Sequence, residues 1–391
     1  MDPSLIALVA VAALASLFMA WVVGAGSSGA TPFAPAVGAN AISTMRAAFV
    51  VGLLGLAGAV TQGGNVSEAV GRGLVDGATL PATGVIVVLF IGAGLMAVGV
   101  RTGYPIATAF TVTGAVVGVG LAVGGTPAWP KYRQVAAVWV LTPVVGGGIA
   151  YGIASVLPRP AVPERYSVAA LAALVGAVLA NVRFAGLGPG GDPGSVVRAV
   201  ARATALQHPL AVPALTLVAA AFLGAVVHRD VGRDLHGGLR RVLLGMGSLV
   251  AFSAGGSQVG LAVGPLLPLV EEAGLASGAL VLAGGGAGIL LGSWTGAPRM
   301  IKSLSRDYSS LGPRRSIAAL VPSFLIAQVA VLLGVPVSFN EIVVSAIVGS
   351  GVAVGGTDAV DARKILVTVG AWVGSLLLAV TLGYGFAAVA A

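Results

Sequence analysis

Long apolar segments, separated by short polar or Gly/Pro-rich stretches, run the whole length of the chain. A helix needs about 20 apolar residues to cross a bilayer, and it satisfies its own backbone hydrogen bonds in lipid. The pattern therefore predicts an all-α integral membrane protein with about twelve transmembrane segments. We place these segments at residues 4–24, 45–62, 81–100, 105–124, 134–157, 166–187, 208–227, 242–262, 276–296, 315–334, 336–354 and 363–388.

Composition supports this interpretation, because 57% of the 391 residues are hydrophobic, only 9% are charged and the mean hydropathy is +1.01. Soluble proteins carry about a quarter charged residues, so there is no room for a sizeable soluble domain. The net charge of +8 comes from basic residues in short loops rather than on one face, so it indicates membrane topology and not nucleic-acid binding. The absence of cysteine excludes disulfides and thiolate metal sites.

The distribution of basic residues predicts which loops are cytoplasmic. The first span lacks the basic start and cleavage site of a signal peptide, and threading the chain with its N-terminus outside places most Lys and Arg residues inside. This threading makes residues 228–241 and 297–314 cytoplasmic and both termini external. The basic residues left outside are Arg72, Lys131, Arg133, Arg183, Arg198 and Arg202.

Two segments of the chain repeat each other. Gly103–Thr126 reads GYPIATAFTVTGAVVGVGLAVGGT and Gly334–Thr357 reads GVPVSFNEIVVSAIVGSGVAVGGT, at an offset of 334 − 103 = 231 residues. In the predicted threading the two segments begin at opposite membrane surfaces, so we expect two inverted repeats, at 1–187 and 208–391, joined by a linker at 188–207. Inverted repeats with broken helices are typical of secondary transporters, whose substrate site lies at the repeat interface.

Polar residues gather where glycine and proline interrupt the apolar segments. We expect helix breaks at residues 25–38 and 255–266, and at the starts of the two repeated segments. Half-helix N-termini there would present free N–H groups to a compact oxyanion. The alternative is that small residues only let membrane helices pack closely. The side chains in these positions are Ser27, Ser28, Thr31, Thr108, Ser257, Gln258, Ser338 and Asn340.

Glu341 is a carboxyl group within an apolar segment. Such a group is costly unless it faces a cavity, is paired or is protonated, so function is one interpretation. The other is that the helix begins later and that Glu341 marks its start at the outer interface. The chain carries no Walker loop, no HExxH motif and no His/Cys cluster, so the sequence gives no reason to expect an enzyme.

The motifs themselves resemble a known family. The stretches AGSSGATPFAPAVG, STMRAAFV and GNVSEAVGRGLVDG in the first half, LRRVLLGMGSLVAFSAGGSQVGLAVGPL in the second, the pair GYPIATAF and GVPVSFNE, and YRQVAAVWVLTPVV follow one order. Over nearly its whole length the chain resembles the inorganic phosphate transporter (PiT) family, which has a GANDVANA-like and a PVSTTH-like motif in each half.

The interiors of the motifs depart from the family pattern. The first Asn-Asp pair falls on Ser27 and Ser28 with the later Asn on Thr31, and the second set falls on Ser257, Gln258 and Leu261. Both aspartates are therefore absent. The Ser-Thr-Thr-His positions fall on Ala107, Thr108, Ala109 and Phe110, and on Ser338, Phe339, Asn340 and Glu341.

The resemblance implies a dimeric, multi-pass plasma-membrane symporter that moves inorganic phosphate with sodium ions by alternating access. The substrate residues would be the eight polar side chains named above, and no other cofactor is expected. Without the aspartates, proton coupling through Glu341 is an alternative to sodium. Transport of sulfate or another oxyanion, an uncoupled anion channel and a non-transporting membrane partner are the other functions left open.

Overall fold

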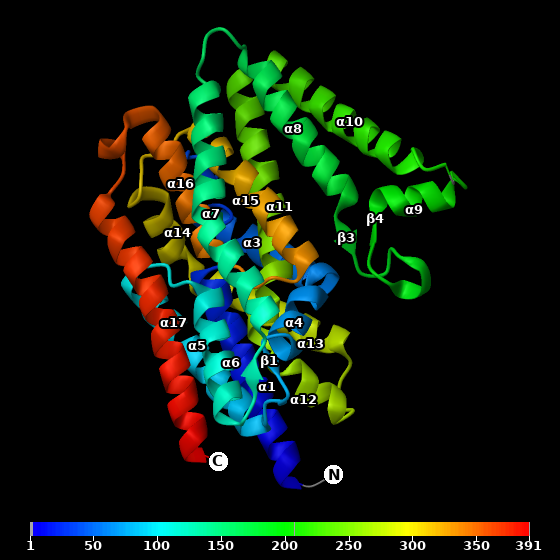
Figure 1. The fold of residues 1–391 in the computed structure, drawn as a ribbon. Helices are drawn as coiled ribbons and strands as arrows, with labels where there is room; N and C mark the ends of the chain where they lie inside the picture. Colours follow the sequence, from blue (N-terminus) through cyan, green and yellow to red (C-terminus); the bar gives the residue numbers. More distant parts are fainter. Residues whose placement is uncertain (1–2, 207, 391) are drawn as a thin grey trace.

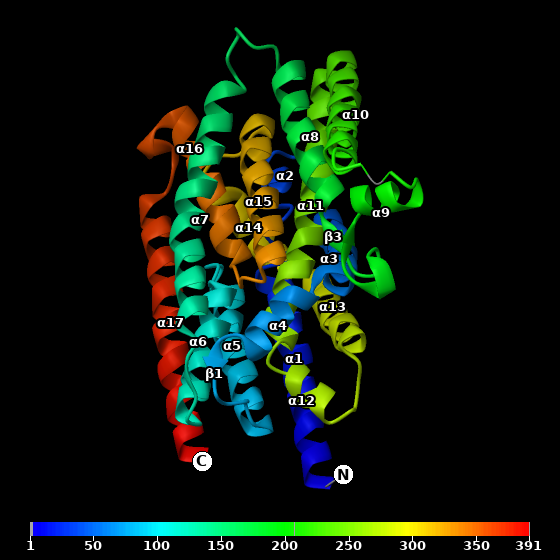
Figure 2. The same ribbon diagram turned by 45° about the vertical axis from the view of Figure 1, so that its right-hand side comes forward.

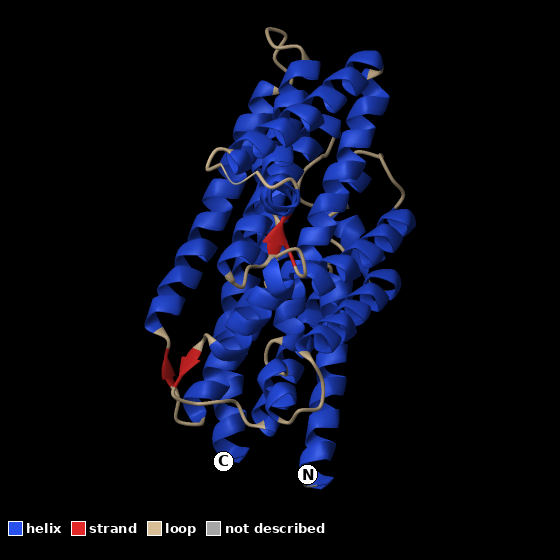
Figure 3. Cartoon of the chain, turned by 90° about the vertical axis from the view of Figure 1, so that its right-hand side faces the viewer, coloured by secondary structure: helices blue, strands red, loops and turns tan. Residues whose placement is uncertain are grey.

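The computed structural model of the chain describes residues 3–206 and 208–390. Gln207 of the predicted linker, and residues 1, 2 and 391 of the predicted halves, lie outside the described residues. Helices form most of the described chain and run side by side in an elongated bundle (Figure 1, Figure 3). The α-helices are α1 (Pro3–Gly26), α2 (Ala34–Gly38), α3 (Thr44–Gln62), α4 (Gly64–Arg72), α5 (Ala82–Thr102), α6 (Thr108–Ala122), α7 (Trp129–Val156), α8 (Glu164–Asn181), α9 (Val196–Ala203), α10 (Ala211–Arg233), α11 (Leu235–Val263), α12 (Leu267–Glu272), α13 (Gly278–Thr295), α14 (Ala297–Arg306), α15 (Pro313–Leu333), α16 (Phe339–Gly355) and α17 (Ala362–Ala390).

Strands in the described residues are confined to two short antiparallel ladders in loops, drawn red in Figure 3. In the first, β1 (Val75–Asp76) pairs with β2 (Thr126–Pro127), and in the second, β3 (Arg183–Phe184) pairs with β4 (Gly194–Ser195). Two short 3₁₀ helices complete the description, η1 (Pro189–Gly191) and η2 (Thr357–Ala359).

Each of the predicted membrane segments contains a helix, so the prediction of an all-α integral membrane protein is confirmed. Among the described residues, nine helices are long and apolar enough to cross a membrane, namely α1, α3, α5, α7, α10, α11, α13, α15 and α17. The helices α6 and α16 are shorter because each begins after a break inside the bundle. The helix α8 carries Glu164 and Arg165 in its first turn, which lowers its apolar character.

The offset of 231 residues recurs in the order of the helices. It carries α5 (82–102) onto α15 (313–333) at both ends, and it relates the series from α1 to α7 to the series from α11 to α17. The contacts are reciprocal, since α6 packs on α17 while α7 packs on α16, and α1 packs on α13 while α3 packs on α11. In Figure 1, α7 runs away from the end that holds both termini and α17 runs toward it. The inverted repeats and their boundaries stay a prediction that these relations favour.

Close helix packing explains why one predicted break comes late in its segment. A break was expected at 255–266, and it occurs at residues 264–266, because α11 continues unbroken to Val263 and α12 begins at Leu267. The glycines of α11 serve contact instead, because a Cβ on Gly255 would lie 1.9 Å from the carbonyl oxygen of Gly55 on α3. A glycine destabilises a helix by only about 1 kcal/mol relative to alanine, whereas a proline removes a backbone hydrogen bond. The first proline in this segment is Pro265, which lies just after the end of α11. Ser257 and Gln258 therefore project from a continuous helix.

Polar contacts join residues that the threading assigns to the same side of the membrane. At the predicted inner side these contacts are Arg240 to the Ala41 carbonyl, Arg299 to the Arg101 carbonyl, Lys364 to Asp307 and Arg314 to Glu164. At the predicted outer side, Arg72 pairs with Glu68 and Glu271, and Lys131 bonds the Gly334 carbonyl. Both described ends of the chain lie at one end of the bundle (Figure 1). The direction of the whole arrangement in the membrane stays a prediction.

Candidate functional site

The first predicted break forms as expected. The helix α1 ends at Gly26, the chain turns through residues 27–33, and α2 begins at Ala34. The Ser28 hydroxyl donates to the Val23 carbonyl at 3.4 Å, and the Thr31 hydroxyl donates to the Ser27 carbonyl at 3.1 Å. Both side chains are fully buried, and these bonds use their protons within the turn. Their oxygen atoms remain able to accept hydrogen bonds.

The two repeated segments begin with the same turn. Gly103 and Gly334 end α5 and α15 in the left-handed conformation, with φ of 77° and 58°, which glycine adopts without strain. A short extended stretch follows, and α6 and α16 then begin inside the bundle. Ser338 caps α16 by accepting a hydrogen bond from the Glu341 N–H at 3.4 Å. Ala107 supplies no side-chain cap to α6, so the first N–H groups of α6 are available to a ligand.

A buried polar cluster joins α1 to α11. The Ser27 hydroxyl donates to Gln258 Oε1 at 3.2 Å, and these two residues stand at the repeat offset of 231. Gln258 Nε2 donates to the Val337 carbonyl at 2.7 Å, and it also lies 3.5 Å from the oxygen of the Ser257 hydroxyl. The three side chains of the cluster, those of Ser27, Ser257 and Gln258, are all 0% exposed. The corresponding motifs of the two halves therefore touch directly.

Asn340 extends this cluster to the two half-helices. Its side-chain amide donates to the Gly26 carbonyl at 3.1 Å and to the Ile106 carbonyl at 2.7 Å. Both partners are acceptors, so the nitrogen must face them, which fixes the orientation of the side chain. Asn340 Oδ1 is buried and has no hydrogen-bond partner among the described residues. This oxygen could therefore accept a hydrogen bond from a ligand or coordinate a cation.

Two of the predicted side chains point elsewhere. The Thr108 hydroxyl faces Met96 Sδ at 3.3 Å, on α5, although its backbone begins α6 beside Asn340. Glu341 stands in the first turn of α16 and is 2% exposed, so it is both a helix-start residue and a buried one. Its Oε2 atom has no hydrogen-bond partner among the described residues. Glu341 borders a cavity of about 590 Å³ between α7, α16 and α17, together with Phe110, Trp139 and Trp372.

The turns that precede the half-helices are held by side chains of the opposite half. Lys131 Nζ, on α7, donates to the Gly334 carbonyl at 2.8 Å, and the Ser303 hydroxyl, on α14, donates to the Gly103 carbonyl at 2.8 Å. Gly103 and Gly334 are equivalent at the repeat offset. The polar cluster thus lies between two similar ties, one toward each end of the bundle.

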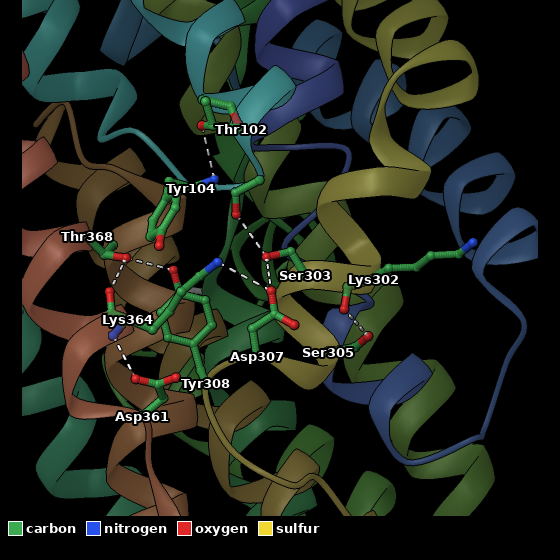
Figure 4. A network of polar contacts seen from close by, with 12 residues as sticks. Thr102, Tyr104, Lys302, Ser303, Ser305, Asp307, Tyr308, Asp361, Lys364 and Thr368 are labelled. Atoms are coloured by element: carbon green, nitrogen blue, oxygen red, sulfur yellow. Dashed lines mark hydrogen bonds and ion pairs between the residues drawn. The ribbon is translucent and has the colours of Figure 1, made fainter.

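Figure 4 shows the tie at Gly103 as part of a larger network. Lys364 Nζ lies 3.3 Å from Asp307 and 3.9 Å from the centre of the Tyr104 ring. The Ser303 hydroxyl lies 2.8 Å from Asp307 Oδ2, so its one proton serves either Gly103 or Asp307. Tyr308 shares a hydrogen bond of 2.8 Å with Thr368, and burial raises the pKa of its phenol well above the usual range. This network joins the turn before α6 to α14 and α17.

Sequence reasoning missed two tryptophans that support the half-helices. Trp139 Nε1 donates to the Pro336 carbonyl at 2.8 Å, and Trp372 Nε1 donates to the Pro105 carbonyl at 2.7 Å. The two prolines are again equivalent at the offset of 231, so the support is reciprocal. A tryptophan in an apolar helix was the available signal, because a buried indole N–H needs an acceptor. The sequence does not tell which carbonyl accepts.

The described residues contain no group of three or more His, Cys, Asp or Glu side chains that could hold a metal ion. The oxygens of the polar cluster are those of hydroxyls, amides and backbone carbonyls. Such oxygens can coordinate sodium, a hard cation, and they can also accept a hydrogen bond from the hydroxyl group of a protonated oxyanion.

Comparison with known proteins agrees with this architecture. Residues 23–383 match the model of the phosphate transporter family. A Pyrococcus furiosus protein provisionally named a phosphate permease is 26% identical over 86% of this chain and 85% of its own, and inorganic phosphate transporter 2-1 of Arabidopsis thaliana chloroplasts is 25% identical over 94% and 70%. A solved structure described as the sodium-dependent phosphate transporter shares the fold, with a TM-score of 0.78, 22% identity and coverage of 98% of both chains. With the family model covering most of its length, the chain belongs to the phosphate transporter family.

Proposed function

We propose that this protein is a secondary transporter that carries inorganic phosphate across the plasma membrane by alternating access. The observation that carries the proposal is the polar cluster of Ser27, Gln258 and Asn340, which joins the end of α1 to α11 and α16 and so brings the corresponding motifs of the two halves together. Phosphate would take hydrogen bonds from the N–H groups that begin α6 and from the Ser257 hydroxyl, which donates to none of the described residues. The Ser27 hydroxyl would exchange its bond to Gln258 for one to the anion. Asn340 Oδ1 would accept from a phosphate hydroxyl.

Burial favours a transporter over an open channel. The side chains of the cluster are 0% exposed, and turns on both sides of it are tied to the opposite half of the chain. A site closed at both ends is an occluded state, which alternating access requires and an open pore does not. The eight substrate residues proposed from the sequence divide accordingly. Ser27, Ser257, Gln258 and Asn340 form the cluster, and Ser28, Thr31, Thr108 and Ser338 surround it.

We also propose that transport is coupled to an ion, which is either sodium or a proton. Sodium is favoured by the likeness to a sodium-dependent transporter and by the oxygen-rich cluster, in which Asn340 Oδ1 has no partner in the described part of the chain. Proton coupling is favoured by Glu341, a buried carboxyl group beside a cavity with one oxygen unpartnered among the described residues. We also propose a homodimer, as the family resemblance implies.

Uptake of labelled phosphate into proteoliposomes tests the proposal. We expect uptake that depends on an ion gradient and is not inhibited by excess sulfate. The double variant Ser27→Ala/Gln258→Ala removes hydrogen bonds to an anion worth about 1.5–3 kcal/mol each, so its apparent affinity should fall tenfold or more. Ser323→Ala is the matched control, because Ser323 is fully buried but bonds only the Ala319 carbonyl of its own helix.

Each of the other outcomes identifies a rival function. Stronger competition by sulfate would make the protein a sulfate transporter, and flux without a gradient requirement would make it a channel. An absence of flux from a folded, correctly inserted protein would indicate a non-transporting partner. Unchanged affinity in the double variant would remove the cluster from the substrate site.

A further inference from the structure

A long groove separates the α8–α10 hairpin from the rest of the bundle. The hairpin stands at one edge, beside α11 and α15 (Figure 1, Figure 2). The groove between them has a volume of about 740 Å³, and its walls are apolar, with Val168, Leu179, Met246 and Val321 among the lining residues. Nothing in the proposed transport cycle uses this space, since none of its lining residues belongs to the polar cluster.

The length of the groove matches one leaflet of a membrane. Along α8 the lining runs from Val168 to Leu179, which is about 16 Å at a rise of ~1.5 Å per residue. Half of a typical hydrocarbon core is ~15 Å. The groove therefore begins at one membrane surface and ends near the middle of the bilayer.

The surface end of the groove is basic. Arg229, Arg233 and Arg241 line it together with Asp230. Arg241 is paired with Asp230 at 2.8 Å and lies 4.0 Å from Asp234. The side chains of Arg229 and Arg233 are exposed and make no ion pair or hydrogen bond with the described residues. Two guanidinium groups are therefore left for an anion at the mouth of an apolar groove.

We propose that the groove binds one anionic phospholipid, with its acyl chains between the hairpin and α11 and α15 and its phosphate on Arg229 and Arg233. Basic pockets between membrane helices suit such headgroups, because guanidinium binds phosphate oxygens through paired hydrogen bonds. A zwitterionic lipid would fill the groove equally well but gain less from the arginines. In the predicted topology the lipid comes from the cytoplasmic leaflet.

Gly245 offers a way to block the groove without touching its charge. It lines the groove on α11, and a Cβ at this position would meet no atom within 4 Å. Gly245→Phe therefore places a ring in the space meant for an acyl chain. The matched control is Gly148→Phe on α7, where a Cβ also meets nothing within 4 Å but the position lies outside the groove.

The charge is tested separately by Arg229→Gln/Arg233→Gln. The control for this variant is Arg159→Gln/Arg306→Gln, which removes two exposed arginines from the same predicted side of the membrane. Neither of these control residues lines the groove or makes a side-chain hydrogen bond or ion pair with the described residues.

The measurement is thermal unfolding of the delipidated full chain in detergent, with phosphatidylglycerol or with phosphatidylcholine of the same acyl chains. We expect phosphatidylglycerol at saturation to raise the midpoint on the order of 5 °C more than phosphatidylcholine does. This difference should disappear in Gly245→Phe and in Arg229→Gln/Arg233→Gln and persist in both controls. Inorganic phosphate at matched concentration would act at the proposed substrate site, so any rise that it causes should be equal in the native chain and in the groove variants.

Native mass spectrometry of the same variants counts the phosphatidylglycerol retained per protomer, which separates loss of the lipid from loss of the fold. One retained molecule in the native chain and none in the groove variants is the expected result. Equal effects of the two lipids, or retention in both groove variants, would overturn the proposal. If the difference between the two lipids disappears only when the protomers dissociate, the groove would be assigned to contact with a second copy of the chain instead.

Discussion

Asn340→Ala tests whether one side chain holds the two half-helices to the end of α1. The amide donates to the carbonyls of Gly26 and Ile106, at 3.1 and 2.7 Å, in a fully buried setting. Gly26 is the last residue of α1, so its carbonyl has no donor within the helix. Each acceptor left unsatisfied costs about 1–3 kcal/mol, so the loss is about 2–6 kcal/mol. At ~2 °C per kcal/mol, the unfolding midpoint should fall by about 4–12 °C.

The matched control is Asn65→Ala. Asn65 is exposed and donates a single bond, to the Val331 carbonyl at 3.2 Å, so its loss should cost about 1 kcal/mol or less. Both variants are purified in one detergent and followed by thermal unfolding, and phosphate uptake is then measured in liposomes. Equal midpoints for the two variants would refute the view that Asn340 joins the half-helices. A lower midpoint with native uptake would keep its structural role and remove Asn340 Oδ1 from the substrate site.

Three further predictions concern coupling, gating and topology. If protons are coupled through Glu341, a pH gradient alone should drive phosphate uptake by the native protein but not by the Glu341→Gln variant. Uptake that requires sodium and survives the substitution would assign the coupling to sodium. Lys131→Met should increase the labelling of a single cysteine introduced at Val337. The substitution removes the hydrogen bond to the Gly334 carbonyl, while the Ser303 hydroxyl still holds the Gly103 carbonyl. Unchanged labelling would mean that Lys131 does not control access to the cluster. Single cysteines at Arg233 and Arg306, in a chain without native cysteine, should react with an impermeant reagent only from the cytoplasmic side, and reaction from outside would reverse the topology.

The helices were predictable from the sequence because the need to cross lipid acts on each segment separately. Length and apolar character place every predicted segment on a helix, and the repeat offset anticipated that α16 begins as α6 does. The turns at Gly103 and Gly334 were predictable for the same reason, since the left-handed conformation depends on the local residue.

Properties that depend on packing between the halves were less predictable. The glycines near Gly255 suggested that the break at 255–266 begins early, but the backbone of α3 lies against them and the helix breaks only after Val263. The direction of the Thr108 side chain depends on Met96 of the neighbouring helix. For Glu341 the sequence offered a helix start or a buried carboxyl group as alternatives, and the two are compatible in the fold because α16 begins inside the bundle.

Charge balance links the lost aspartates to the chemistry of the cluster. A phosphate anion near two carboxylates needs cations to offset their repulsion, so a site with aspartates depends strongly on bound sodium. In this chain Ser28 and Gln258 stand at the two aspartate positions and both are neutral, and Gln258 bonds Ser27, the neighbour of Ser28. In the proposed site the anion would then meet hydroxyls, amides and the positive end of α6 without carboxylates in the cluster itself. Binding of phosphate there would need less help from a cation than in a site with aspartates. Glu341, which faces the neighbouring cavity, would be free to act in coupling without opposing the substrate directly.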